Sequence, residues 1–305
     1  MQNDFKTKYF IHVLVFLLVT SILIFSLLII GEKSLNKKGV SVTKTLKPFQ
    51  EINLEARGAM VWDIVNHREL FSKNSDAPLP LASLTKVMTA VTTNGKLNGG
   101  QKIKITKEDL EPEGDSKLVV GDIWQAKDLR DFTLLTSSND GAFALAAVAH
   151  VDEGDPKNSS FVKEMNDTAS KIGLSNSKFF NEHGLDSSAD RGGAYGSAKD
   201  MALLFEYTLK NYPEILEATR YKNVHFNSEK ETYVGQNTNI IIDKIPNIIA
   251  SKTGYTDLAG GNLVIAFDAG LNRPIIISIL GSTAEGRFED ALKLVEASLQ
   301  YINEE

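Results

Sequence analysis

The most apolar part of the sequence is a run of 22 residues near its N-terminus, from Tyr9 to Ile30. Only one histidine and three hydroxyl side chains interrupt it. A helix of this length crosses a hydrocarbon layer about 30 Å thick. The run is longer than the apolar region of a cleavable signal peptide, and no small-residue cleavage pattern follows it. We therefore expect an uncleaved transmembrane signal anchor over residues 9–31, after a short tail, 1–8.

The segment that follows the apolar run is rich in Lys, Ser and Thr and shows no clear period, so residues 32–51 are predicted to be a linker. Lysines flank the apolar run on both sides, with Lys6 before it and Lys33 after it. The positive-inside rule therefore does not decide which side of the membrane the rest of the chain occupies.

Residues 52–305 alternate between short β-rich runs and amphipathic helical patterns, and we treat them as one domain. Strands are expected at both ends of this body and helices in its middle, with one more helix at the C-terminus. The simplest architecture is an α/β (α+β) domain, in which one antiparallel sheet is assembled from both ends of the chain around a helical insertion. The predicted strands are 56–64, 70–71, 248–252, 262–268 and 273–280, and the predicted helices begin near Ser83 or cover 128–150, 159–172, 197–210 and 288–302.

Composition narrows the chemistry that this body can perform. Hydrophobic residues make up 42% of the chain and charged residues 24%, which is typical of a globular protein. The net charge of −6 argues against a nucleic-acid partner. The absence of cysteine excludes disulfides, cysteine-bound zinc, iron–sulfur clusters and a thiol nucleophile. The histidines show no paired-ligand spacing, so we expect neither a metal nor a cofactor.

The first candidate for chemistry is the pair Ser83 and Lys86. A serine with a lysine three residues later occurs five times in the chain, but only this pair opens a strongly apolar helix. The spacing places both side chains on one helix face, and the positive end of the helix dipole disfavours a protonated lysine. A neutral Lys86 could accept the proton of Ser83 and so activate it as a nucleophile. Taken alone, the pair is better explained as an N-terminal capping serine beside a solvated lysine.

Two further motifs change this interpretation. Ser137-Ser138-Asn139 follows an apolar stretch, and Lys252-Thr253-Gly254 ends another one. Ser-x-x-Lys, Ser-Asp-Asn and Lys-Thr-Gly together are the signature of class A β-lactamases and penicillin-binding proteins. The order of the three motifs also fits, with about 50 residues between the first and second and about 115 between the second and third. Together they indicate a serine acyl-transfer enzyme.

With these motifs in place, the sequence resembles the low-molecular-weight penicillin-binding proteins that are serine-type D-alanyl-D-alanine carboxypeptidases, peptidase family S11. The resemblance covers roughly residues 52–302 and implies a β-lactamase-like transpeptidase fold with a helical subdomain. It differs at Ser138, where the family often has glycine, and at Tyr255, where some members have histidine. Four further blocks carry it: Leu81–Ala90, Phe180–Asp186, Ser197–Ala202 and Asn237–Asn239.

The resemblance implies a role for each catalytic residue. Ser83 would attack the peptide bond between two D-alanines and form an acyl-enzyme, with Lys86 as its general base. Ser137 would relay a proton to the leaving amine, and Lys252 would keep the network electropositive. The backbone N–H groups of Ser83 and Tyr255 would form the oxyanion hole.

The resemblance also implies how the substrate is held. Asn139 would bind an amide of the substrate, while Thr253 and the strand backbone around Gly254 would dock the peptide in extended form and hold its terminal carboxylate. Arg287 stands where the family often has an arginine that helps to hold this carboxylate. A surface arginine at the start of a helix is an equal alternative for Arg287. His183 is more readily explained as a structural loop residue than as a catalyst.

The implied substrates are peptidoglycan stem peptides that end in D-Ala-D-Ala, with β-lactams as covalent inhibitors. Such a function would place the body outside the cell membrane, tethered by a single N-terminal span that takes the place of a C-terminal anchor. Three alternatives stay open. They are a D-alanyl endopeptidase that cuts cross-links, a β-lactamase-like enzyme, and a catalytically silent member of the family. No Glu-x-x-Leu-Asn stretch lies between Asn139 and Lys252, so we expect slow β-lactam hydrolysis.

Overall fold

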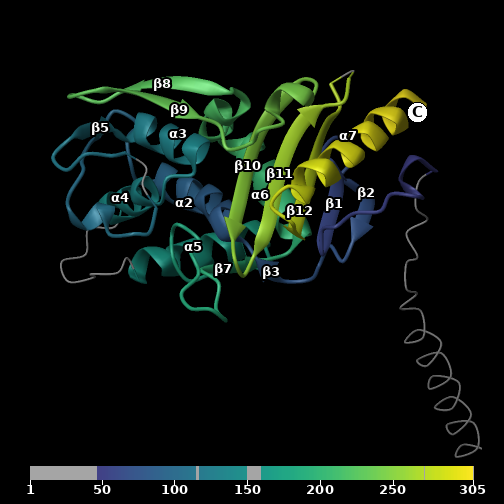
Figure 1. The fold of residues 1–305 in the computed structure, drawn as a ribbon, viewed down its shortest axis with the longest axis horizontal. Coiled ribbons are helices and arrows are strands. Elements are labelled where there is room, and N and C mark those ends of the chain that lie inside the picture. The colour runs from purple at the N-terminus through teal and green to yellow at the C-terminus, as the bar shows by residue number, and fades with distance from the viewer. Residues whose placement is uncertain (1–46, 115–116, 150–158, 271, 305) are drawn as a thin grey trace, which may run out of the picture. The chain divides into compact units, whose positions relative to one another are not determined.

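The computed structural model describes residues 47–114, 117–149, 159–270 and 272–304, and its centre is a five-stranded antiparallel sheet (Figure 1). Strand β1 pairs with β12, with Val61 opposite Ile277, so the two ends of the body meet in one sheet as predicted. The predicted strands are all present, and β10 is longer than expected because it includes the whole Lys-Thr-Gly motif. In spatial order the strands are β10 (Ile248–Thr256), β11 (Gly260–Asp268), β12 (Pro274–Ser282), β1 (Gly58–Asp63) and β2 (Arg68–Lys73).

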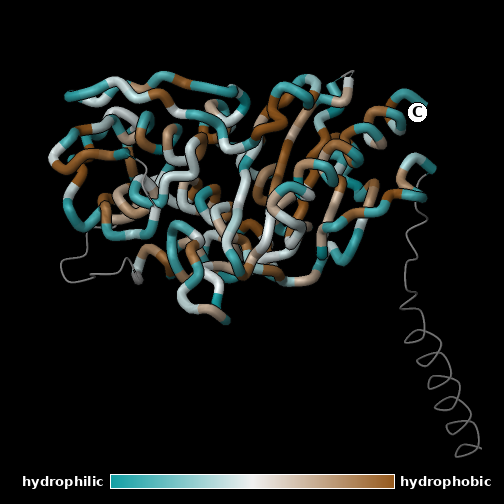
Figure 2. Tube along the Cα trace, in the orientation of Figure 1, coloured by the Kyte–Doolittle hydropathy of each residue, from teal (hydrophilic) through white to brown (hydrophobic). Residues whose placement is uncertain are grey.

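Both faces of the sheet are buried. Alternate side chains of the inner strands point to opposite faces, and each face packs against its own apolar cluster. Ile277 belongs to the apolar cluster beneath α7 (Gly286–Glu304), while its neighbour Ile276 belongs to the cluster shared with α6 (Ala198–Asn211). Figure 1 shows α7 in front of the sheet and α6 behind it, and Figure 2 shows hydrophobic residues along these strands. The sheet is therefore covered by helices on both faces and supports the residues at its edge.

The helical insertion packs beside β10 and is built around one buried helix. This helix, α2 (Thr85–Asn94), follows the short 3-10 turn η2 (Ala82–Leu84), and Thr85 to Thr93 are all buried in it. A helix that is buried on every face belongs to the interior of a domain rather than to its surface. The helices that surround it are α3 (Ala126–Thr136), α4 (Asn139–Ala149) and α5 (Ser159–Ile172).

The single helix predicted over 128–150 is wrong, because the structure has two helices there. Ser137 follows α3 in the left-handed conformation, with φ of 63°, and such a residue ends a helix. The Ser138 hydroxyl then accepts a hydrogen bond of 2.9 Å from Gly141 N in the first turn of α4. Hydrophobic periodicity continues across the break and hides it. The Ser-x-Asn motif is the break itself.

Several short strands had no counterpart in the sequence-based expectations. The β8–β9 hairpin covers an aromatic cluster in which the Trp124 and Tyr233 ring centroids lie 4.7 Å apart. Strands of two to five residues carry too short a pattern to be recognised from alternation. These short strands are β3 (Leu79–Pro80), β4 (Lys102–Lys104), β5 (Ile123–Gln125), β6 (Lys178–Phe179), β7 (Ala194–Gly196), β8 (Asn223–Asn227) and β9 (Thr232–Gln236). The 3-10 turns other than η2 are η1 (Lys47–Phe49), η3 (Glu108–Leu110), η4 (Pro213–Ile215), η5 (Glu217–Arg220) and η6 (Ile242–Lys244).

The predicted transmembrane segment, 9–31, lies outside the described residues. None of the helices in the described part of the chain is both long enough and apolar enough to cross a membrane. Phe49, which falls in the range predicted as a linker, is buried, with its ring centroid 6.3 Å from that of Tyr301 on α7.

Candidate active site

Ser83 lies in a tight turn between β3 and α2 that packs against the C-terminal half of β10. Ala82 before it has a left-handed φ of 48°, which is strained for a residue with a side chain. A side chain at Gly184 would overlap the Ala82 carbonyl oxygen, and a Cβ on Gly254 would lie 3.1 Å from Ser83 N. Both glycines let neighbouring backbone segments approach the turn closely, which fixes the position of Ser83.

Lys86 lies directly behind Ser83, with its Nζ atom 2.8 Å from Ser83 Oγ. The same Nζ donates hydrogen bonds of 2.6 Å to Asn139 Oδ1 and to the backbone carbonyl oxygen of His183. The lysine is only 1% exposed. The structure thus brings together the predicted nucleophile, its predicted base and the asparagine of the second motif.

Burial lowers the pKa of Lys86 to about 7, although the nearby carboxylates of Glu182 and Asp140 act in the opposite direction. A neutral amine has two protons and one lone pair. It can donate to Asn139 Oδ1 and the His183 carbonyl and still accept the proton of the Ser83 hydroxyl. This is the arrangement that a general base for a serine nucleophile requires.

His183 contributes through its backbone, which the sequence did not reveal. Its Nε2 lies 3.8 Å from Glu182 Oε1, which is within ion-pair distance, but burial lowers the pKa of His183 to about 3. The ring is therefore neutral and forms no ion pair. The block Phe180–Asp186 is remote from Ser83 in the sequence, yet it contacts the site in two ways. The His183 carbonyl oxygen accepts a hydrogen bond from Lys86, and Gly184 packs against the Ser83 turn.

Ser137 and Lys252 form the second pair of the site. Lys252 Nζ lies 2.9 Å from Ser137 Oγ and donates to the Thr253 carbonyl oxygen at 2.8 Å. Burial lowers the pKa of Lys252 well below its ordinary value, and the charges of Lys86 and Arg287 lower it further. These surroundings favour a neutral amine. The electropositive role that the resemblance implies for Lys252 stays a prediction, and a nearby anion such as a substrate carboxylate would favour the charged form.

The side chain of Asn139 is engaged at both ends. Its Oδ1 accepts from Lys86, and its Nδ2 donates a 2.6 Å hydrogen bond to the Glu113 carbonyl oxygen. Gly114, with a left-handed φ of 109°, lies so close that a Cβ there would be 3.1 Å from Asn139 Nδ2. Because the amide nitrogen has two protons, it can still donate to a substrate carbonyl while it holds the Glu113 carbonyl. No sequence motif indicated the contact with Glu113.

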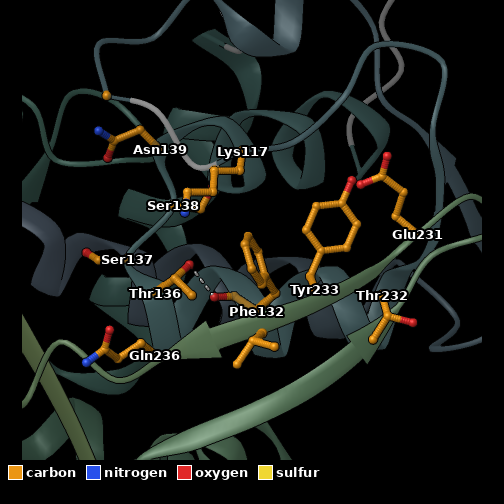
Figure 3. Close-up of a pocket in the computed structure, with 12 residues that line it drawn as sticks. Lys117, Phe132, Thr136, Ser137, Ser138, Asn139, Glu231, Thr232, Tyr233 and Gln236 are labelled. Atoms are coloured by element: carbon orange, nitrogen blue, oxygen red, sulfur yellow. Dashed lines mark hydrogen bonds between the residues drawn. The ribbon is translucent and has the colours of Figure 1, made fainter.

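Two cavities flank the Asn139–Gly114 contact, and both residues line each of them. One cavity, of about 550 Å³, extends from Ser137 and Gln236 at one end to Tyr233 and Glu231 at the other (Figure 3). The other, of about 660 Å³, extends to Tyr255 at the end of β10. Together they provide space for an extended ligand that passes Asn139.

Strand β10 is an edge strand of the sheet, and its open side faces the Ser83 turn. Ser251 N points away from β11, because it donates to Thr219 Oγ1 at 3.1 Å. By strand alternation, the N–H groups of Thr253 and Tyr255 point to the same side. This direction is the one that the predicted role of Tyr255 N in the oxyanion hole requires, and the pairing with Ser83 N stays a prediction. The Tyr255 side chain itself is 51% exposed.

Thr253 and Arg287 lie at the predicted carboxylate end of the site. Arg287, half-buried at the start of α7, donates a 2.6 Å hydrogen bond from an Nη atom to the Gly254 carbonyl oxygen. This contact favours a role in the site over a solvated surface position. The Thr253 hydroxyl lies 2.6 Å from that of Thr238, a residue of the Asn237–Asn239 block that sequence reasoning did not connect to the site. Across the described ranges, no group of His, Asp or Glu side chains could hold a metal ion.

These residues define a serine acyl-transfer site of the Ser-x-x-Lys type on the edge of an antiparallel sheet. Comparison with known proteins agrees, because residues 42–284 match peptidase S11, D-alanyl-D-alanine carboxypeptidase. The chain belongs to this family of serine-type D-Ala-D-Ala carboxypeptidases.

Individual relatives give the same family. The chain is 30% identical over 259 residues to the D-alanyl-D-alanine carboxypeptidase DacF of Bacillus subtilis, covering 82% of this chain and 64% of DacF. It is 27% identical to the D-alanyl-D-alanine endopeptidase of Escherichia coli, covering 89% of this chain and 86% of the relative. Cefotaxime-bound penicillin-binding protein D2 of Listeria monocytogenes superposes with a TM-score of 0.70 at 28% identity, covering 81% of this chain and 98% of that one. The chain spans about three fifths of the length of the curated carboxypeptidases that it matches.

Proposed function

We propose that this protein is a serine-type D-alanyl-D-alanine carboxypeptidase that removes the terminal D-Ala from peptidoglycan stem peptides through an acyl-enzyme on Ser83. The observation that carries the proposal is the position of Lys86 Nζ, 2.8 Å from Ser83 Oγ, in surroundings that lower its pKa to about 7. The family to which the chain belongs and the cefotaxime-bound relative support this reading.

In the proposed reaction, Ser83 Oγ bonds to the carbonyl carbon of the penultimate D-Ala while its proton passes to Lys86 Nζ. The N–H groups of Ser83 and Tyr255 stabilise the oxyanion of the tetrahedral intermediate. The C–N bond then breaks, and the proton reaches the leaving nitrogen by way of the Ser137 hydroxyl. Water, deprotonated by Lys86, hydrolyses the ester and releases Ser83. β-Lactams would form a corresponding acyl-enzyme on Ser83.

Substrate binding follows from the open edge of β10. An extended peptide adds to this edge as a further strand, and Asn139 Nδ2, which donates one proton to the Glu113 carbonyl, donates its second proton to a carbonyl of the peptide. The terminal carboxylate lies near Thr253, Lys252 and Arg287. Its negative charge favours the ammonium form of Lys252, which keeps this end of the site electropositive when substrate is bound.

Cleavage of D-alanyl cross-links is the second candidate function, because the E. coli endopeptidase matches this chain over most of the length of both proteins. We expect the detergent-solubilised full chain to release free D-Ala from an acyl-D-Ala-D-Ala peptide, measured with a coupled D-amino-acid oxidase assay. Cross-linked muropeptide dimers, separated by chromatography, provide the comparison. Faster cleavage of the dimers would make the endopeptidase the principal activity, and no cleavage of either substrate would contradict both proposals.

We also propose that the body lies outside the cytoplasmic membrane, tethered by the apolar run at residues 9–30, because peptidoglycan is found only there. Alkaline phosphatase fused after Glu305 is expected to be active in intact cells, since it folds only in an oxidising compartment. The same fusion to a protein lacking residues 1–31 serves as the control and is expected to lose this activity. Activity of a cytoplasm-dependent reporter at the same position would overturn the topology.

A further inference from the structure

The loop Asn237–Asn239 touches the active site, but none of the catalytic steps above uses it. Thr238 Oγ1 lies 2.6 Å from Thr253 Oγ1, and Thr238 N donates to the Leu135 carbonyl oxygen at 3.3 Å. Leu135 is two residues before Ser137. Thr238 therefore bridges the two chain segments that carry the second and third motifs.

The two asparagines hold Thr238 in this position. Asn237 Nδ2 donates to the carbonyl oxygens of Thr219 and Tyr221 at 2.8 and 2.9 Å, and its Oδ1 accepts from Asn239 N at 2.8 Å. Asn239 Oδ1 in turn accepts from Ile241 N at 3.2 Å. Asn237 is 8% exposed and Asn239 is 1% exposed. Such a buried network leaves the Thr238 hydroxyl little freedom to move away from Thr253.

The direction of the hydrogen bond between the two threonines decides what Thr253 can offer to a ligand. A hydroxyl has one proton to donate and lone pairs that accept, whereas a carboxylate can only accept. If Thr253 donated to Thr238, it would present only lone pairs to the carboxylate. If Thr238 donates to Thr253, the Thr253 proton is free to point at the carboxylate.

We propose that Thr238 is a positioning residue that donates to Thr253 and so orients the Thr253 hydroxyl toward the terminal carboxylate of the substrate. Thr238 thereby contributes to the preference for peptides with a free C-terminus. The inference rests on the proposed carboxypeptidase function and extends it to a residue outside the three motifs. Thr238 does not touch the reacting atoms.

The test compares Thr238→Val with Thr238→Ser on two substrates, an acyl-D-Ala-D-Ala peptide with a free carboxylate and the same peptide with a C-terminal amide. We expect Thr238→Val to lower kcat/KM for the acid about tenfold, mainly through KM, because one hydrogen bond to a charged group loses its orientation. The amide should change less than twofold. Thr238→Ser keeps the hydroxyl and should stay within twofold on both substrates.

A double-mutant cycle with Thr253→Val separates positioning from general damage. We expect the double variant to be no worse on the acid than Thr253→Val alone.

Thr238→Ala, which adds no branched methyl group, is expected to show the same loss of discrimination, and it replaces the valine variant if that variant unfolds at a lower temperature. Equal losses on acid and amide, or additive losses in the cycle, would overturn the inference. If a Thr238 variant is active but keeps the acid-to-amide ratio of the unsubstituted protein, the inference about Thr238 is wrong and the proposed function stands. If the unsubstituted protein releases no D-Ala, the proposed function is wrong as well.

Discussion

Replacing Ser83 by alanine is expected to abolish covalent labelling by a fluorescent penicillin and to lower the release of D-Ala by at least ~10⁴-fold. Without Oγ there is no atom to form the acyl bond, and Lys86 alone cannot replace it. The fold should persist, because Lys86 Nζ keeps its hydrogen bonds to Asn139 and to the His183 carbonyl. Labelling is read on a denaturing gel, and thermal unfolding reports on the fold.

The chain offers a matched control for this substitution in Ser175. It also precedes a lysine, Lys178, by three residues, but it lies in an exposed turn between α5 and β6. Ser175→Ala should be labelled like the unsubstituted protein. Persistent labelling of Ser83→Ala at the unsubstituted level would show that another residue carries the acyl group.

Replacing Lys86 by methionine is expected to lower the rate of acylation by 10²- to 10⁴-fold while Ser83 stays in place, the range typical for loss of a general base. Methionine preserves much of the length and apolar character of the lysine stem but cannot accept a proton. Stopped-flow measurement of labelling rates gives the comparison. Lys178→Met, at the exposed Ser-x-x-Lys pair, should leave the rate unchanged.

The pH profile distinguishes a base from a lysine that only packs. Because the pKa of Lys86 is lowered to about 7 and the neutral form is active, acylation should fall about tenfold for each pH unit below 7 and level off above it. Lys86→Met should lose this acid limb. A variant that is slower but keeps the same profile would show that another group provides the titration.

The same titration links the site to stability. The pKa of Lys86 falls from 10.5 to about 7 on folding, so the unfolded chain holds more protons between these two pH values. The contribution of Lys86 to the free energy of unfolding is therefore lowest below pH 7 and rises by roughly 5 kcal/mol as the pH approaches 10.5. Denaturant unfolding at several pH values should show a weaker rise for Lys86→Met.

The sequence was sufficient for the main sheet and for the central chemistry, because both depend on residues close together in the chain or on strong patterns. Ser83 and Lys86 share one helical turn, and the isoleucines of β12 alternate between two buried faces. The three motifs and the family resemblance supplied Ser137, Asn139 and Lys252. The structure places Asn139 against Lys86, places Ser137 against Lys252, and brings Lys86 near enough to Lys252 for its charge to act there.

The rest depended on backbone geometry that side-chain patterns do not encode. The left-handed conformation of Ser137 splits a stretch whose apolar period is uninterrupted. The partners of Lys86 and Asn139 at His183 and Glu113 are carbonyl oxygens, which every residue type possesses. Thr238 carries an ordinary hydroxyl, and only its distance from Thr253 gives it significance.

The two edges of the sheet show how the protein avoids association with other sheets while one edge stays open to a peptide. The outer strand β2 carries Arg68, Glu69 and Lys73, and charged side chains on an edge oppose pairing with another sheet. At β10 the residues near the edge are mostly uncharged or buried, so charge cannot give this protection. Instead, the Ser83 turn lies against Gly254 in its C-terminal half, and Asp186 accepts a 3.0 Å hydrogen bond from the Thr256 hydroxyl at its end. Neighbouring segments of the same chain thus cover part of this edge, so resistance to aggregation and access of substrate depend on the same strand.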